Sequence, residues 1–272
     1  LDRPRAVACA HSPWGTHRHR SHVTGGGTGI GEAVAVDLAK AGVAVTVCGR
    51  RLEPLEDTVK QIEAVGGSGR AIAADMTNPD DIEALAADVL KATGGVDILI
   101  NNAGFSSKVR SARYIGAEEW RAVMDVNTMG PAILTRALLE PMIERGRGDV
   151  VMISSMAGLR PSVMAGVVYS SAKTAAKAYM EVLQQEVKRY GIRCCTVYPG
   201  EVDTPILDNR ALVPDEQARA LMMQSEDISA AVMMALQLPH RATVTEIAVT
   251  ATVPRDMSAD IKAALTKQTP QG

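Results

Sequence analysis

The sequence is poor in cysteine, and its few cysteines are not arranged for cross-linking. Four cysteines among 272 residues are too few for a disulfide framework, and none of them forms a Cys-x-x-Cys pair. Cys194 and Cys195 are neighbours on a predicted strand, so their side chains should point to opposite faces of a sheet. That arrangement argues against a shared metal ion or disulfide, and we interpret the cysteines as reduced thiols.

The sequence also lacks an excess of charge of either sign and lacks a long apolar run. Its formal net charge is −2 with 22% charged residues, which provides no basic surface for nucleic-acid phosphates or anionic lipids. The apolar stretch from Ala6 to Ala10 is far shorter than a signal-peptide core or a membrane-spanning helix requires. We therefore expect no nucleic-acid or membrane partner, and a soluble protein of the cytoplasm.

Short apolar runs that favour strands alternate with longer segments of helical period. After residue 24 the predicted strands are Val43–Cys48, Arg70–Ala74, Val96–Ile100, Asp149–Ile153, Ile192–Val197 and Glu246–Thr250. The predicted helices are Gly29–Ala41, Leu52–Val65, Asp80–Lys91, Glu118–Arg145, Val167–Arg189 and Glu226–Leu236. Such alternation is typical of βαβ units, and strands this apolar are buried on both faces. The prediction is an α/β protein: a single-domain, Rossmann-like, doubly wound parallel sheet of about seven strands, with helices on both faces.

The strand that should precede residue 24 departs from this pattern. It contains His17, His19 and His22 together with two arginines, although an unpaired charge buried in a central strand costs several kcal/mol. Strand alternation places His17 and His19 on one face and His22 on the other, so we expect no metal site there. We interpret residues 1–22 as an atypical or mistranslated start, which resequencing of the gene would test.

A glycine-rich loop joins that strand to the first predicted helix. It reads Thr-Gly-Gly-Gly-Thr-Gly-Ile-Gly over residues 24–31. Glycines there permit a tight turn and bring the backbone close to a pyrophosphate, whose charge the helix N-terminus favours. A merely flexible turn is the alternative. The spacing Thr-Gly-x-x-x-Gly-x-Gly resembles the loop of the short-chain dehydrogenases/reductases.

The end of the second predicted strand indicates which dinucleotide this loop would hold. NAD enzymes usually place a carboxylate there to bind the ribose hydroxyls, but this sequence has Arg50 and Arg51. A guanidinium binds a 2′-phosphate through paired charge-assisted bonds, so Arg50 predicts NADP, with Arg51 assisting and NAD less favoured. A solvated arginine pair at a helix start is the alternative.

Two further motifs match the same family in order. Asp75, followed by Met76, resembles the family's acidic residue that binds the adenine amino group, with a helix-capping acid as the alternative. The Asn-Asn-Ala-Gly sequence at residues 101–104 resembles the family motif in which amides stabilise the sheet and small residues let the cofactor lie close.

Tyr169 and Lys173 are spaced one turn apart on a predicted helix. A tyrosine must lose roughly 2–3 pKa units to act as a base near neutral pH, or about 3–4 kcal/mol. An ammonium about 4.5 Å from the phenolate supplies about 3.7 kcal/mol at an effective dielectric of about 20. The spacing alone is common on helices, so its meaning depends on the residues that accompany it.

Ser155 and Asn127 accompany this pair in the order that the family implies. Ser155, preferred over Ser154 because Gly158 completes a Ser-x-x-Gly pattern, corresponds to the serine that holds the substrate oxygen. Asn127 corresponds to the residue that holds a relay water. The resemblance thus implies that Asn127, Ser155, Tyr169 and Lys173 are catalytic. It implies that the cofactor contacts Gly25, Gly27, Thr28, Gly29, Ile30, Gly31, Arg50, Arg51, Asp75, Met76, Asn102, Ala103, Gly104, Tyr169, Lys173, Pro199, Gly200, Val202 and Thr204.

The expected function is NADP-dependent interconversion of a small carbonyl and a secondary alcohol, with Tyr169 as acid and base. The alternative is a catalytically idle NADP-binding sensor or scaffold of the same fold. Residues 23–256 are expected to form the domain, with a variable substrate loop at 205–224 and a tail at 257–272. Apolar residues in that loop could form a lid or pack on the core. The family resemblance implies a homodimer or homotetramer.

Overall fold

The computed structural model describes residues 19–268, and within them a single parallel sheet organises the chain. The sheet has seven strands in the order β3-β2-β1-β4-β5-β6-β7, and every pairing is parallel. The strands are β1 Arg20–Thr24, β2 Ala44–Gly49, β3 Ser68–Ala73, β4 Ile98–Asn101, β5 Gly148–Ile153, β6 Ile192–Pro199 and β7 Glu246–Val249. This is the predicted doubly wound Rossmann-like fold, because the strand order reverses direction between β1 and β4.

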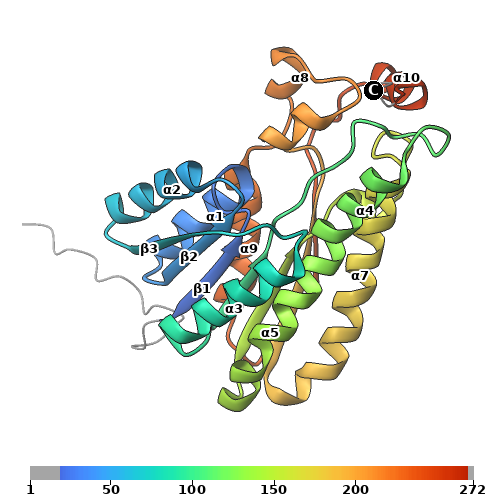
Figure 1. The fold of residues 1–272 in the computed structure, drawn as a ribbon. Coiled ribbons are helices and arrows are strands. Elements are labelled where there is room, and N and C mark those ends of the chain that lie inside the picture. The colour runs from blue at the N-terminus through green and yellow to red at the C-terminus, as the bar shows by residue number, and fades with distance from the viewer. Residues whose placement is uncertain (1–18, 269–272) are drawn as a thin grey trace, which may run out of the picture.

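Helices cover both faces of the sheet (Figure 1). Helices α1, α2 and α9 supply apolar residues to the core on one face, and α3, α5 and α7 supply them on the other. Their bounds are α1 Gly29–Lys40, α2 Leu52–Ala64, α3 Pro79–Thr93, α5 Gly130–Arg145, α7 Val167–Val187 and α9 Ser225–Gln237. Shorter segments are α4 Ala117–Met124, α6 Met156–Leu159, α8 Glu216–Ala220 and α10 Ser258–Thr266, with 3-10 turns at Lys188–Tyr190 and Pro205–Asn209. Helices α8 and α10 lie at the same end of the molecule (Figure 1).

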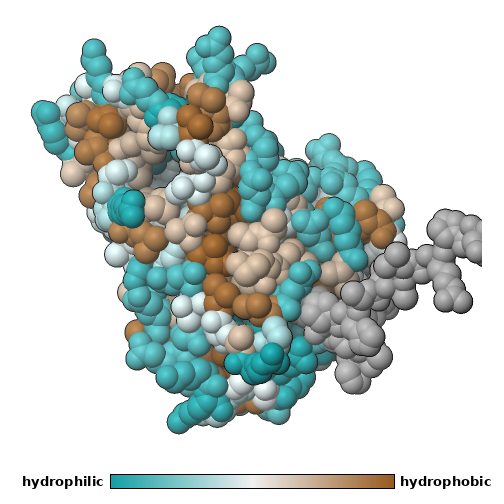
Figure 2. All heavy atoms as spheres, turned by 180° about the vertical axis from the view of Figure 1, so that it is seen from behind, coloured by the Kyte–Doolittle hydropathy of each residue, from teal (hydrophilic) through white to brown (hydrophobic). Residues whose placement is uncertain are grey.

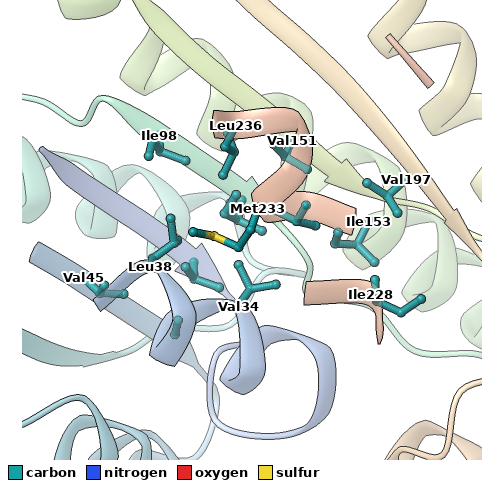
Figure 3. Packing of buried hydrophobic residues seen from close by; sticks show 14 of the residues in the cluster. Val34, Leu38, Val45, Ile98, Val151, Ile153, Val197, Ile228, Met233 and Leu236 are labelled. Carbon is teal, nitrogen blue, oxygen red and sulfur yellow. The ribbon is translucent and has the colours of Figure 1, made fainter. Parts of the chain in front are cut away.

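The core on the first face is built by interlocking apolar side chains from distant parts of the sequence. Val34 and Leu38 of α1 meet Met233 and Leu236 of α9 over the strands (Figure 3). Cys195 belongs to this core and Cys194 to the opposite one, as strand alternation predicts. The described residues contain no helix that is long and apolar enough to cross a membrane.

The polar first strand forms in spite of its composition. Arg20 begins β1 and is only half-buried, and its side chain reaches Asp97 at 3.5 Å. The strand pairs along its whole length with β2, and His22 at its centre is fully buried. His17 and Arg18 lie outside the described residues. The expected burial of unpaired arginine charge is therefore wrong for Arg20, because the guanidinium lies at the strand's start beside a carboxylate.

The predicted single helix Glu118–Arg145 is divided into three parts, which is a correction. Helix α4 ends at Met124, a π-helical turn covers Asp125–Met129, and α5 begins at Gly130. Pro131 lacks the N–H that would bond to the carbonyl four residues earlier, so an unbroken α-helical ladder cannot form here. The π turn places Asn127 at the irregular position.

Candidate active site

The carboxyl ends of the central strands surround a cavity of about 630 Å³, with a second cavity of about 170 Å³ beside it. Open α/β sheets bind ligands at this edge, where the strand order reverses. Every predicted cofactor residue except Gly31 lines at least one of the two cavities. The structure therefore brings together residues from Gly25 to Thr204 that the sequence placed in six separate motifs.

The glycine loop packs closely against the residues that follow β4. Gly25 has a φ of +63°, and a Cβ at this position would lie 2.9 Å from the Cα of Ala103. A Cβ at Gly31 would lie 2.3 Å from the carbonyl oxygen of Gly25. The side-chain Nδ2 of Asn102 donates to the carbonyls of Thr24 and Gly25 at 3.0 and 3.1 Å. The loop is thus a backbone-lined cradle that larger residues would fill, which suits a pyrophosphate.

Arg50 and Arg51 lie at one end of this cradle with their charges available. Both are exposed, both line the two cavities, and neither side chain bonds to a described residue. Asp75 lies in the smaller cavity, where its Oδ1 accepts bonds at 2.9 Å from the N–H and hydroxyl of Thr77. Its other carboxylate oxygen remains available, so the turn it stabilises does not preclude a ligand contact.

Tyr169 and Lys173 project from the first turns of α7 into the larger cavity. The Nζ of Lys173 lies 5.6 Å from the centroid of the tyrosine ring and donates to the carbonyl of Ile153 at 3.0 Å. Gly166, whose φ is +84°, directly precedes the helix, and the N–H of Val167 donates to the carbonyl of Arg110 at 3.0 Å. The start of the helix, and with it the tyrosine, is fixed by the loop that carries Arg110.

The two candidate serines have different partners. Ser155 caps the short helix α6, where its Oγ accepts from the N–H of Ala157 at 3.2 Å, and its hydroxyl lies near enough to Tyr169 to lower the pKa of the tyrosine. Ser154 is buried, and its hydroxyl donates to the carbonyl of Lys173 at 3.4 Å. The hydroxyl that engages the tyrosine is therefore that of Ser155.

Burial has the largest effect on the pKa values of Tyr169 and Lys173. It raises the pKa of the Tyr169 hydroxyl, while the bond to Ser155 and then the charges of Arg110 and Arg210 lower that pKa. Burial also lowers the pKa of Lys173 to about 8. Both shifts from burial favour the neutral forms. The lowering of the tyrosine pKa by Lys173 stays a prediction.

Asn127 is buried beneath the same end of the site. Its Nδ2 donates to the carbonyls of Phe105 and Val123 at 2.9 and 2.8 Å, and its Oδ1 has no partner among the described residues. A Cβ at Gly104 would lie 2.6 Å from that oxygen and 3.4 Å from the Nζ of Lys173. Gly104 therefore leaves open the space between the amide and the ammonium.

Comparison with known proteins agrees with this geometry. The family model for short chain dehydrogenases matches residues 21–213, which include all four predicted catalytic residues. This chain belongs to the short-chain dehydrogenase family. An uncharacterised oxidoreductase of Staphylococcus aureus (strain USA300) is 32% identical over 229 residues, covering 84% of this chain and 94% of that protein.

Solved structures resemble this short-chain dehydrogenase over most of its length. A metagenomic short-chain oxidoreductase in complex with NADP is 29% identical with a TM-score of 0.76, covering 87% of this chain and 98% of the other. An alcohol dehydrogenase from the archaeon Thermococcus sibiricus, complexed with 5-hydroxy-NADP, is 26% identical with a TM-score of 0.79, covering 88% and 99%.

The variable loop of this short-chain dehydrogenase divides its apolar residues between lid and core. Leu207, Met222 and Met223 are buried, and Met223 belongs to the core beneath α1 and α9. Leu221 is 52% exposed and lines the larger cavity, as do Ile206 and Leu207. Leu212 and Val213 are exposed and line neither cavity. Part of the loop therefore packs on the core and part lines the larger cavity, and the lid stays a prediction.

Two groups at the site were missed by the sequence analysis. Arg110 lies in the irregular segment between β4 and α4, which matches no motif and has no periodicity. The second group is a charge cluster of Glu201, Arg210, Arg255 and Asp260. One member, Asp260, comes from the segment that the sequence analysis treated as a tail, where residues 258–266 form α10. No local signal connects four charges that lie so far apart in sequence.

Proposed function

We propose that this short-chain dehydrogenase is an NADP-dependent oxidoreductase that interconverts a carbonyl and a secondary alcohol. The observation that carries the proposal is the meeting of Tyr169, Ser155 and Lys173 in one cavity with a glycine-lined cradle. Bound NADPH would supply the hydride that this reaction requires. The chain itself would hold the carbonyl oxygen and deliver the proton.

Each side chain has a role that its contacts support. Ser155 would donate a hydrogen bond to the substrate oxygen, and the hydroxyl of Tyr169 would transfer its proton to that oxygen. Lys173, held by the carbonyl of Ile153, would favour the tyrosinate that results. Asn127 has an unpartnered Oδ1 in the space next to Lys173, where a water would link the lysine to solvent.

Replacement of the tyrosine tests this proposal. Tyr169→Phe should reduce carbonyl-dependent oxidation of NADPH to background, because the only proton donor at the substrate oxygen is lost. NADPH binding, followed by fluorescence titration, should remain close to that of the wild type. Tyr190→Phe is the matched control, since Tyr190 lines neither cavity. Substantial turnover by Tyr169→Phe would refute the role, and NADPH binding without turnover by the wild type would favour the sensor.

The cofactor preference rests on the two free guanidiniums. Arg50 and Arg51 have no protein partner among the described residues and line the cradle, and two similar structures contain NADP or 5-hydroxy-NADP. Arg50→Asp should lower kcat/KM for NADPH by about 10²-fold or more, and lower that for NADH much less, because a carboxylate repels the 2′-phosphate. Equal effects on both cofactors would contradict the preference.

We also propose a homodimer or homotetramer. The family resemblance assigns the interface to the predicted helices Glu118–Arg145 and Val167–Arg189, and both present exposed apolar side chains, with Met129 at 55% and Val182 at 62% exposure. On another face, a band of hydrophobic surface runs between hydrophilic regions (Figure 2). Exposed apolar patches mark interaction surfaces. Light scattering of the purified protein should give a mass of two or four chains, and a monomer would contradict this proposal.

A further inference from the structure

Arg110 places a buried positive charge at the substrate side of the larger cavity. It is only 5% exposed and lines the cavity together with Tyr169, Ser155 and the loop at 205–210. Its guanidinium donates to the carbonyl of Ala165 at 2.6 Å, to the hydroxyl of Ser106 at 2.8 Å and to the carbonyl of Asn209 at 3.3 Å. All three acceptors are neutral.

No carboxylate of the described residues neutralises this guanidinium. Arg110 forms no salt bridge with them, and its Nε is buried without a hydrogen-bond partner. Glu119 acts on it electrostatically, but the carboxylate of Glu119 accepts a bond from Ser107 instead. A buried charge without a counter-charge is unfavourable by several kcal/mol. Burial accordingly lowers the pKa of Arg110 to about 10, which still leaves it charged at neutral pH.

The surrounding structure is shaped to keep Arg110 in this place. A Cβ at Gly166 would lie 2.7 Å from the Cδ of Arg110 and 2.9 Å from its Cα. Gly166 also has a φ of +84°, which other residues rarely adopt. The turn before α7 therefore admits the arginine directly beside the helix that carries Tyr169.

The cavity as a whole is positively charged, although the chain is not. The chain has 29 basic and 31 acidic residues, whereas a single acidic residue, Glu201, is found among the residues that line the larger cavity. The basic residues lining it are Arg50, Arg51, Arg110, Arg160, Lys173, Arg210 and Arg255. Glu201 and Asp260 pair with Arg210 and Arg255. At the substrate end, Arg110 and Arg160 remain without a carboxylate partner among the described residues.

We propose that the physiological substrate carries a carboxylate close to its reacting carbonyl, and that Arg110 recognises this carboxylate. The inference rests on the proposed function and assigns its substrate class: a short oxo acid, reduced to the hydroxy acid by addition of one hydride and one proton to the carbonyl. A guanidinium is suited to this task because it pairs with a carboxylate through directed, charge-assisted bonds. The substrate carboxylate would supply the counter-charge that the Arg110 guanidinium lacks among the described residues.

A purely mechanical role for Arg110 makes a different prediction. The three bonds of its guanidinium connect the segments around Ser106, Ala165 and Asn209, and this connection would serve acidic and neutral substrates equally. Truncation of the Arg110 side chain would then weaken the binding of acidic and neutral ligands by the same factor. Recognition of charge instead predicts that truncation weakens the binding of the acid and leaves the binding of the neutral ligand unchanged.

Binding to the protein saturated with NADP⁺ separates these roles without relying on turnover. The probes are benzoylformate and its methyl ester, measured by isothermal titration calorimetry. We expect the acid to bind the wild type about tenfold or more tightly than the ester, and Arg110→Gln to remove that difference while changing ester binding by less than about threefold. Arg110→Lys, which keeps the charge, should retain part of the preference.

Arg160→Gln is the matched control, because it removes the same charge from the same cavity at an exposed position. Solvent screening should limit its effect on acid binding to less than about threefold. Thermal unfolding establishes that each variant is folded. Equal binding of acid and ester by the wild type, no binding of the acid, or an equal loss of both ligands in Arg110→Gln would overturn the inference. Acid binding without any turnover would contradict the proposed function alone.

Discussion

Ser155 and Ser154 are adjacent, yet their hydroxyls face different partners. Of the two serines, only Ser155 lowers the pKa of Tyr169. Ser155→Ala should therefore decrease kcat by about 10²–10³-fold, as does loss of one donor to a reacting oxygen. It should also raise the pKa of Tyr169, so that the acidic limb of the pH profile for alcohol oxidation, where the tyrosine base becomes protonated, moves to higher pH. Ser154→Ala is the control, and an equal loss of kcat in both variants would contradict the assignment.

The residues of the site were predictable where a motif fixes them by spacing, and were not where only the fold brings them together. Ser155 could be preferred over Ser154 because Gly158 lies three positions later. Arg110 could not be found, because its importance comes from burial beside α7 and from the lack of an ion pair with any carboxylate of the described residues. Neither property is encoded in the residues that flank Arg110.

The segment after β7 connects to the substrate loop through buried charges. Arg255 pairs with Glu201 at 2.8 Å and with Asp260 of α10 at 2.9 Å, and the side chain of Asp260 is only 7% exposed. Asp260→Asn removes one charge of this cluster and should lower stability by about 3–5 kcal/mol at most, because Arg255 and Arg210 lose a buried partner. Amide hydrogen exchange should become faster in α10 and in residues 205–210.

An exposed ion pair provides the control for that experiment. Arg70 and Asp88 are paired at 2.6 Å, with exposures of 44% and 46%. Exposed pairs contribute about 0–1 kcal/mol, so Asp88→Asn should leave exchange in α10 and at 205–210 unchanged. Identical exchange in Asp260→Asn and the wild type would show that the cluster does not hold these segments together.

Among the secondary-structure elements, strands and helices with a continuous pattern were predicted to within a few residues. The break at Asp125–Met129 was not predicted, because helical periodicity continues through it. Pro131 lies in the first turn of α5, a position where proline is common. Helix α10 was also missed. It is short, and its Asp260 is satisfied by arginines from other segments, so the sequence around it contains no strong local signal.

At the scale of the whole molecule, the sheet was predictable because β2, β4, β5 and β6 are apolar runs buried on both faces. The expectation of burial on both faces is wrong for the edge strands β3 and β7, which are partly exposed. The first strand is not an apolar run, and it forms because its neighbours pair with it from both sides. Two of its polar residues, Ser21 and His22, have buried side-chain atoms without a partner among the described residues. His22 is fully buried, and both ring nitrogens lack a partner among the described residues.

His22 makes the stability of the whole fold depend on pH. Burial lowers its pKa from 6.5 to about 4, so the unfolded chain binds a proton between these values that the folded chain does not. Stability should fall as the pH decreases from 6.5 to about 4, by up to about 3 kcal/mol at 1.36 kcal/mol per pKa unit, and this contribution should end below that range. Urea unfolding at pH 7 and at pH 4.5 measures the loss.

Replacement of His22 by an apolar residue should remove this part of the loss. Residue 22 lies in the sheet between Thr46 of β2 and Leu99 of β4, so His22→Val suits a strand position and leaves no group to protonate. His240→Asn is the control: burial also lowers the pKa of His240, but that ring is only partly buried, and its loss should preserve most of the difference between pH 7 and pH 4.5. Other titrating groups, including Asp149, whose pKa burial raises, are common to the wild type and His22→Val and cancel in that comparison. If His22→Val lost as much stability at pH 4.5 as the wild type, the acid sensitivity would have to come from those groups instead.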